Sequence, residues 1–136
     1  MLFALGLTFA PRLPRWAVIL VAVFAAGYGA AAFLNSTDTI SVALAILFLI
    51  FMVIGSSRRL YATMFIISLS MELYGTAIGN WVWVAEVPGL PLTSANPPLC
   101  VGGLYCGLDL CVVNADRFLR RWRRNTGIVV EARSAA

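Results

Sequence analysis

Four long apolar stretches divide this chain, and short polar segments separate them. The stretches lie at 16–34, 40–56, 60–84 and 98–116. A helix needs roughly 20 residues, within a range of about 17–25, to cross the hydrocarbon core of a bilayer. The pattern therefore predicts an all-α fold, an integral membrane four-helix bundle. We expect residues 1–15 to form an interfacial arm and residues 117–136 to form a basic cytoplasmic tail.

The amino-acid composition favours the same class of protein. Hydrophobic residues make up 61% of the chain and charged residues only 12%. A soluble domain is usually close to half apolar and a quarter charged. This shortage of charge predicts a protein that is embedded in a membrane rather than dissolved in water.

The basic residues predict how the bundle is oriented. All ten of them are arginine, and they precede the first apolar stretch, separate the second from the third, and follow the fourth. The other two connections contain no basic residue. Because arginine and lysine are retained on the cytoplasmic side, we expect both termini to be cytoplasmic. The chain would then be a multi-pass protein of a bacterial-type inner (plasma) membrane.

The sizes of the side chains predict which helices pack closely. Bulky residues fill the stretch at 40–56, whereas the other three stretches carry small residues spaced four apart. These small residues are Ala22, Ala26 and Ala30, then Gly75 and Gly79, then Gly103 and Gly107. Small residues at this spacing allow helix backbones to approach each other. The first, third and fourth helices are therefore expected to form the core, with the second facing lipid.

Two acidic residues lie well inside apolar stretches, Glu72 in the third and Asp109 in the fourth, whereas Asp116 is the last residue of the fourth. A charged side chain at the centre of a bilayer costs about 2.5–3.5 kcal/mol on insertion scales. We therefore expect both acids to face the interior of the bundle. They are the candidate catalytic residues, with Glu72 as proton donor and Asp109 as its partner. It remains open whether they are instead neutral groups that join helices by hydrogen bonds.

Polar and aromatic residues close to these acids are the candidates for binding a substrate. The segment from Trp81 to Tyr105, which joins the third and fourth stretches, combines aromatic residues with four prolines, which fix the backbone. It predicts either a rigid hairpin or an aromatic lid over a cavity that contains Glu72. The substrate-binding candidates are Thr76, Asn80, Trp81, Trp83, Asn96 and Tyr105.

Several chemistries find no support in the sequence. The chain contains no histidine, which removes the usual zinc and haem sites. On one helix Cys100, Cys106 and Cys111 would point in different directions, so we expect neither a metal site nor a cofactor. No phosphate-binding loop or nucleophile elbow occurs. Apart from the basic tail nothing fits nucleic acid, so we expect no such partner.

The segment from Glu72 to Pro98 contains four features in order. They are a glutamate, a turn rich in Gly and Thr, an aromatic-x-aromatic pair and a proline-containing loop. The residues are Glu72, Gly75, Thr76, Gly79, Trp81, Trp83 and Pro88. This order resembles the membrane carotenoid hydratases of the bacterioruberin-pathway type, over about a fifth of the chain. Those proteins are longer, have more spans and usually carry Tyr in the aromatic pair. The resemblance implies a site that holds a long isoprenoid and protonates an alkene, with Glu72 as the acid.

Three functional hypotheses follow. In the first, the protein binds or converts a hydrophobic, isoprenoid-like or lipid-like molecule by acid–base chemistry at the intramembrane carboxylates. In the second, it is a proton-coupled carrier of a small molecule. In the third, it is a non-catalytic accessory subunit of a larger membrane complex. The expected partners are membrane lipid, an isoprenoid ligand, and further copies of the chain or a larger complex.

Overall fold

The structure, a computed structural model, describes residues 2–125, without the side chains of 2–4, 109, 110, 112–114, 116, 117 and 123–125. All regular elements of the described chain are helices, and the only β pairing among the described residues is an isolated bridge between Glu86 and Thr93. The elements in order are α1 (Leu2–Phe9), the 3-10 helix η1 (Ala10–Arg12), α2 (Arg15–Asn35), α3 (Thr39–Ile54), α4 (Arg58–Ala77) and α5 (Gly102–Asn125). The expected all-α class is confirmed.

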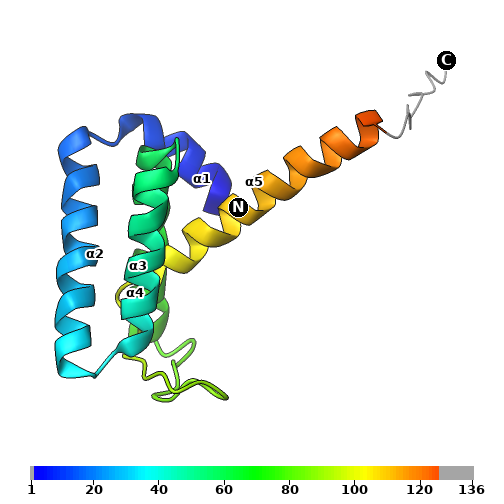
Figure 1. The fold of residues 1–136 in the computed structure, drawn as a ribbon. Coiled ribbons are helices and arrows are strands. Elements are labelled where there is room, and N and C mark those ends of the chain that lie inside the picture. The colour runs from blue at the N-terminus through cyan, green and yellow to red at the C-terminus, as the bar shows by residue number, and fades with distance from the viewer. Residues whose placement is uncertain (1, 126–136) are drawn as a thin grey trace.

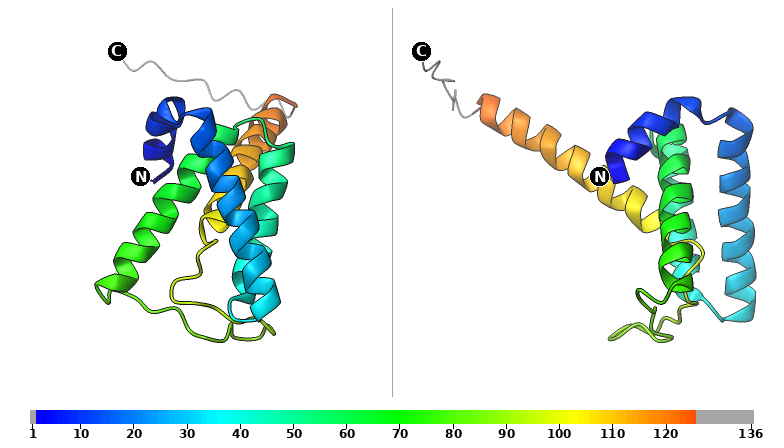
Figure 2. Two further views of the ribbon diagram at one scale, coloured as in Figure 1. Left: turned by 90° about the vertical axis from the view of Figure 1, so that its left-hand side faces the viewer. Right: turned by 180° about the vertical axis from the view of Figure 1, so that it is seen from behind.

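The helices α2, α3 and α4 run up and down beside one another, and α1 folds back along α4 (Figure 1). α5 begins against α3 and α4 and then leaves them at a steep angle. The long connection between α4 and α5 passes beneath the end of the bundle where α2 meets α3 (Figure 2). One end of the bundle is therefore covered by this connection, which we call the α4–α5 loop.

One face of α3 belongs to the core of the bundle, together with residues of α2 and α4, contrary to the prediction that α3 faces lipid. Its buried residues are Ser41, Leu44, Ala45, Phe48, Phe51 and Met52. Phe48 is fully buried and packs on Phe65 of α4, with ring centroids 4.6 Å apart. A Cβ added at Gly29 of α2 would lie 2.7 Å from the Cβ of Ala45, so these two helices touch closely. The prediction was wrong because bulky side chains suit a buried centre as well as a lipid-facing surface.

Two glycines explain how α5 can cross the other helices. A Cβ at Gly102 would lie 2.6 Å from the Cα of Phe65, and a Cβ at Gly103 would run into the carbonyl oxygen of Leu44. The start of α5 therefore lies directly against the backbones of α3 and α4. Glycine is required where backbones come this close, because any side chain would force them apart.

The helix α4 is shorter than the apolar stretch that contains it. It ends at Ala77, and the predicted continuation to residue 84 belongs to the loop. The N–H of Gly79 donates to the carbonyl of Thr76, and that of Asn80 to the carbonyl of Gly75. Together with the positive φ of 72° at Gly79, these bonds form a Schellman C-cap, which the apolar pattern alone does not reveal.

Of the helices in the described part of the chain, α2 alone is long and apolar enough to span a membrane. α3 is apolar but shorter. Beyond α2, the predicted four-span topology and the cytoplasmic position of both termini stay predictions. α5 differs from the fourth predicted span in its first residue, which is Gly102, and it continues to Asn125, within the residues expected as a basic tail.

The crossing of α5 gives a test of the packing. Gly103→Ala should lower the free energy of unfolding by about 1–3 kcal/mol, because the new methyl group meets a backbone carbonyl that cannot rotate away. Gly27→Ala is the matched control, since a Cβ there meets nothing within 4 Å. It should raise stability by about 0.5–1 kcal/mol, because alanine replaces glycine inside a helix. Thermal unfolding in detergent measures both changes. Equal effects of the two substitutions would contradict the close crossing.

Candidate functional site

The carboxylate of Glu72 is buried in α4 and accepts three hydrogen bonds. The indole N–H groups of Trp81 and Trp83 donate to Oε2 at 2.8 Å and 3.0 Å. The hydroxyl of Tyr105 donates to Oε1 at 3.1 Å. Glu72 itself is only 6% exposed. We call these four residues the Glu72 cluster.

The donors of the cluster define what each carboxylate oxygen can still do. An indole N–H can only donate, so both lone-pair positions of Oε2 are filled by tryptophan. Oε1 has one partner, the Tyr105 hydroxyl, which can donate or accept. A further partner or a transferable proton therefore belongs on Oε1, on the side of Tyr105.

The local sequence builds the cluster around the end of α4. Gly75 lies three residues after Glu72, and a Cβ there would run into the ring of Trp81. The missing side chain provides the space in which this indole lies against the helix. The Schellman turn at Gly79 then reverses the chain, so that Trp81 and Trp83 reach back to a carboxylate in the preceding turns.

The α4–α5 loop is held in place at its other side as well. The side-chain oxygen of Asn96 accepts a hydrogen bond from the backbone N–H of Trp83 at 2.9 Å. The N–H of Thr93 donates to the Thr39 hydroxyl at 2.8 Å, and the N–H of Ile40 donates to the Thr93 carbonyl at 3.0 Å. These bonds join the loop to the start of α3. The loop is thus fixed both to the end of α4 and to the α2–α3 connection.

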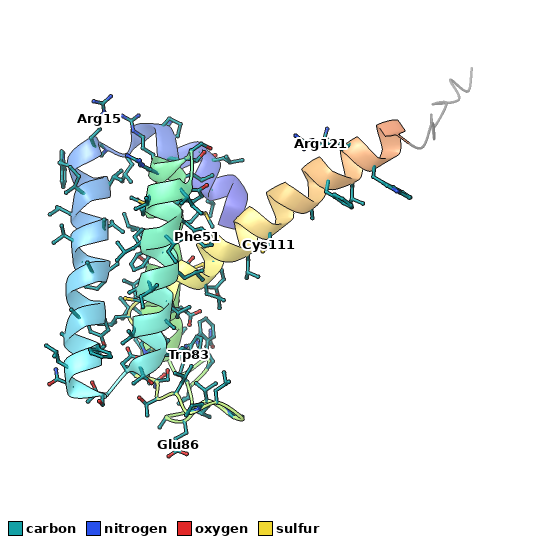
Figure 3. All side chains as sticks on the ribbon, viewed as in Figure 1. Arg15, Phe51, Trp83, Glu86, Cys111 and Arg121 are labelled. Carbon is teal, nitrogen blue, oxygen red and sulfur yellow. The ribbon has the colours of Figure 1, made fainter. Side chains whose placement is uncertain are left out.

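The tip of the loop is a tight turn rather than part of the site. A turn of four residues runs from Val87 through Pro88 and Gly89 to Leu90, whose N–H donates to the Val87 carbonyl. Gly89 has a φ of 78°, which the third position of a type II turn requires. Glu86, next to this turn, is directed away from the bundle (Figure 3). The tip therefore contributes no group to the Glu72 cluster.

The structure brings some of the predicted site residues together and separates others. Three of them, Trp81, Trp83 and Tyr105, donate hydrogen bonds to the carboxylate of Glu72. Asn96 accepts a hydrogen bond from the backbone N–H of Trp83.

Two predicted residues do not reach the carboxylate. The hydroxyl of Thr76 donates to the backbone carbonyl of Glu72 at 2.7 Å, as threonines inside helices often do. Asn80 is exposed and takes part in the helix cap through its backbone N–H. Asp109 follows Tyr105 by four residues in α5, and its side chain lies outside the described part of the structure. Whether the two acids meet stays a prediction.

A second buried carboxylate was missed by the sequence analysis. Asp38 is 1% exposed and precedes α3. Its Oδ2 accepts a hydrogen bond from the hydroxyl of Tyr28 at 3.0 Å, whereas its buried Oδ1 has no hydrogen-bond partner among the described residues. Its place in a short polar connection suggests a solvent-exposed loop residue. The α4–α5 loop bonds to the neighbouring Thr39 and Ile40, and tertiary packing of this kind leaves no local signal in the sequence.

The known proteins offer no comparison for this site. No family model, curated protein or solved structure matches the chain. The resemblance to carotenoid hydratases therefore stays a prediction. The function has to be argued from the geometry of the Glu72 cluster.

The cluster predicts that Glu72→Leu loosens the loop. A leucine has a similar size but no acceptor, so both indole N–H groups and the Tyr105 hydroxyl lose their partner. A buried donor left without an acceptor should cost about 1–3 kcal/mol. We expect a lower unfolding temperature and a red shift in tryptophan emission. Glu86→Leu, at the exposed side of the loop, is the control and should change neither quantity. Identical spectra and melting curves for both variants would show that the cluster does not hold the loop.

Proposed function

We propose that this protein is an integral membrane protein that acts on a carbon–carbon double bond of a hydrophobic, isoprenoid-like molecule, with Glu72 as the acid. The observation that carries the proposal is the Glu72 cluster, a buried carboxyl group whose three hydrogen-bond partners are all aromatic. No basic side chain takes part in these bonds. The site is thus apolar and contains a proton donor, which is the combination that protonation of an alkene needs.

The surface of the bundle supports its place in a membrane. Large apolar side chains on α2 and α3 are highly exposed, among them Phe33, Leu34, Val53 and Ile54, at 68–80%. Apolar surface of this extent is typical of contact with lipid or with another protein. Arg15 lies at the end of the bundle opposite the α4–α5 loop, and the described end of α5 points toward that same side (Figure 3). This arrangement supports a multi-pass protein with both termini cytoplasmic.

The proposed reaction starts with the carboxyl group of Glu72. Its proton moves from Oε1 to one carbon of the double bond, and the π electron pair forms the new C–H bond. The other carbon becomes a carbocation, which the faces of nearby aromatic rings stabilise. Water then adds to this carbon and returns a proton to the carboxylate. The net change is the addition of one water molecule, and the acid is regenerated.

The other members of the Glu72 cluster position the acid. Trp81 and Trp83 fix Oε2, so that Oε1 is the oxygen that exchanges the proton. Tyr105 shares a hydrogen bond with Oε1 and orients it. The role of Asp109 as partner acid stays a prediction.

An accessory subunit is the second candidate, because α5 extends beyond the bundle with apolar side chains uncovered. Phe118, Leu119 and Trp122 are 48–68% exposed there. Such a helix could dock on a larger membrane protein. A proton-coupled carrier stays a hypothesis that uses the same carboxylate.

The first experiment is gentle extraction into nanodiscs, followed by native mass spectrometry and an absorption scan of the same sample. A bound isoprenoid or pigment is the expected result and would identify the class of substrate. Stable co-purification of larger proteins with no ligand would contradict the proposal and favour the accessory subunit.

Turnover in cells that make the bound isoprenoid then tests the role of Glu72. Glu72→Gln should lower formation of the hydrated product by about 10²–10⁴-fold, because it removes the acid. Trp83→Phe loosens the loop through loss of one hydrogen bond but keeps the carboxyl group, so it should retain most of this activity. Normal turnover in Glu72→Gln would refute the assignment. Because glutamine can keep the three hydrogen bonds, a loss in Glu72→Gln reports the missing acid rather than a loosened loop.

A further inference from the structure

A groove runs between α2, the end of α3 and the start of α4, at the end of the bundle opposite the Glu72 cluster. Its volume is about 610 Å³, within the range of about 300–1,000 Å³ that is usual for small-molecule sites. One face of α2 forms its long wall. The lining residues are Arg15, Val18, Ile19, Ala22, Val23, Ala26, Met52, Arg58 and Arg59.

The lining is divided into a charged mouth and an apolar body. Arg15, Arg58 and Arg59 form the mouth, and all three are exposed. The remaining lining residues are apolar. From Val18 to Ala26 the groove follows α2 for about 12 Å at a rise of about 1.5 Å per residue. The groove is therefore amphipathic along its length.

Among the described residues, no acidic side chain lies in the first turn of α2 or α4, where the three arginines of the mouth are located. Within the described chain, the only hydrogen bond from these three side chains goes from Arg59 to the carbonyl of Pro11, at 3.5 Å. A guanidinium group has five N–H donors, so most donors at the mouth have no acceptor in the described part of the chain. Three arginines with such donors beside an apolar groove complement an anion that carries an alkyl chain.

We propose that this groove binds an anionic membrane phospholipid. Its phosphate group accepts hydrogen bonds from Arg15, Arg58 and Arg59, and one acyl chain lies along α2 between Val18 and Ala26. A free phosphate would leave the apolar body unused, and an uncharged isoprenoid would leave the arginines unused. This site is separate from Glu72 and does not depend on the reaction proposed there.

The head-group contacts are tested by native mass spectrometry of the full chain in detergent, titrated with phosphatidylglycerol or phosphatidylcholine. The protein should bind the first phosphatidylglycerol at least tenfold more tightly than phosphatidylcholine. Arg58→Gln should weaken binding of phosphatidylglycerol on the order of tenfold, as expected for loss of a charged hydrogen bond. Arg12→Gln is the matched control, because Arg12 lies at the same end of the bundle but outside the groove, against the ring of Phe9. It should leave the affinity unchanged.

The acyl-chain contacts are tested by filling the groove. Ala26→Trp places a large ring in the apolar body, and Ala30→Trp places the same ring on an exposed position of α2 outside it. Only Ala26→Trp should weaken binding of phosphatidylglycerol, again by about tenfold. Inorganic phosphate at millimolar concentration should not displace the lipid.

Three results would overturn the proposal. Equal losses in Arg12→Gln and Arg58→Gln would mean unspecific attraction to a basic end of the bundle. Equal effects of the two tryptophans would place the acyl chain elsewhere. Displacement by inorganic phosphate alone would assign the arginines to a free anion and leave the groove without a role. Unchanged melting curves of the tryptophan variants establish that a loss of binding is not a loss of folding.

Discussion

The buried carboxylate of Glu72 connects α4 with the α4–α5 loop and with the start of α5. Glu72 lies in α4, and its three hydrogen bonds come from two tryptophans in the α4–α5 loop and from a tyrosine in α5. A buried carboxylate without partners costs several kcal/mol, so the donors and the acid depend on each other. Through these bonds one side chain of α4 fixes the loop and the start of the next helix. The candidate chemistry depends on the same contacts.

The remaining architecture follows from where backbones approach each other. α3 is central because α2 packs on one side of it at Gly29 and α5 crosses on another at Gly103. Since α5 begins against the backbones of α3 and α4, Tyr105 lies one turn further, within reach of Glu72. The two ends of the bundle differ as a consequence. One carries the loop and the buried acid, and the other carries the arginines that surround the apolar groove.

The sequence predicted the helical class. It also placed Trp81, Trp83 and Tyr105 around Glu72, as candidates for binding a substrate and not as a set of hydrogen-bond donors to the carboxylate. It did not predict the end of α4, because the cap depends on a left-handed glycine that also fits an apolar span. It placed Thr76 at the carboxylate, although the threonine hydroxyl bonds to the helix backbone. Asp38 and one face of α3 are buried by tertiary packing. Side-chain size does not predict whether a residue faces the core or the surface.

The most direct test of the account is hydrogen exchange at the indole N–H groups, followed by NMR of protein labelled with ¹⁵N-tryptophan in detergent. The hydrogen bonds to Glu72 predict slow exchange for Trp81 and Trp83, and fast exchange for Trp16, whose side chain is 65% exposed. In Glu72→Leu, which removes the acceptor, both slow signals should become fast. Exchange at Trp81 and Trp83 as rapid as at Trp16 in the natural protein would contradict the central role of this carboxylate.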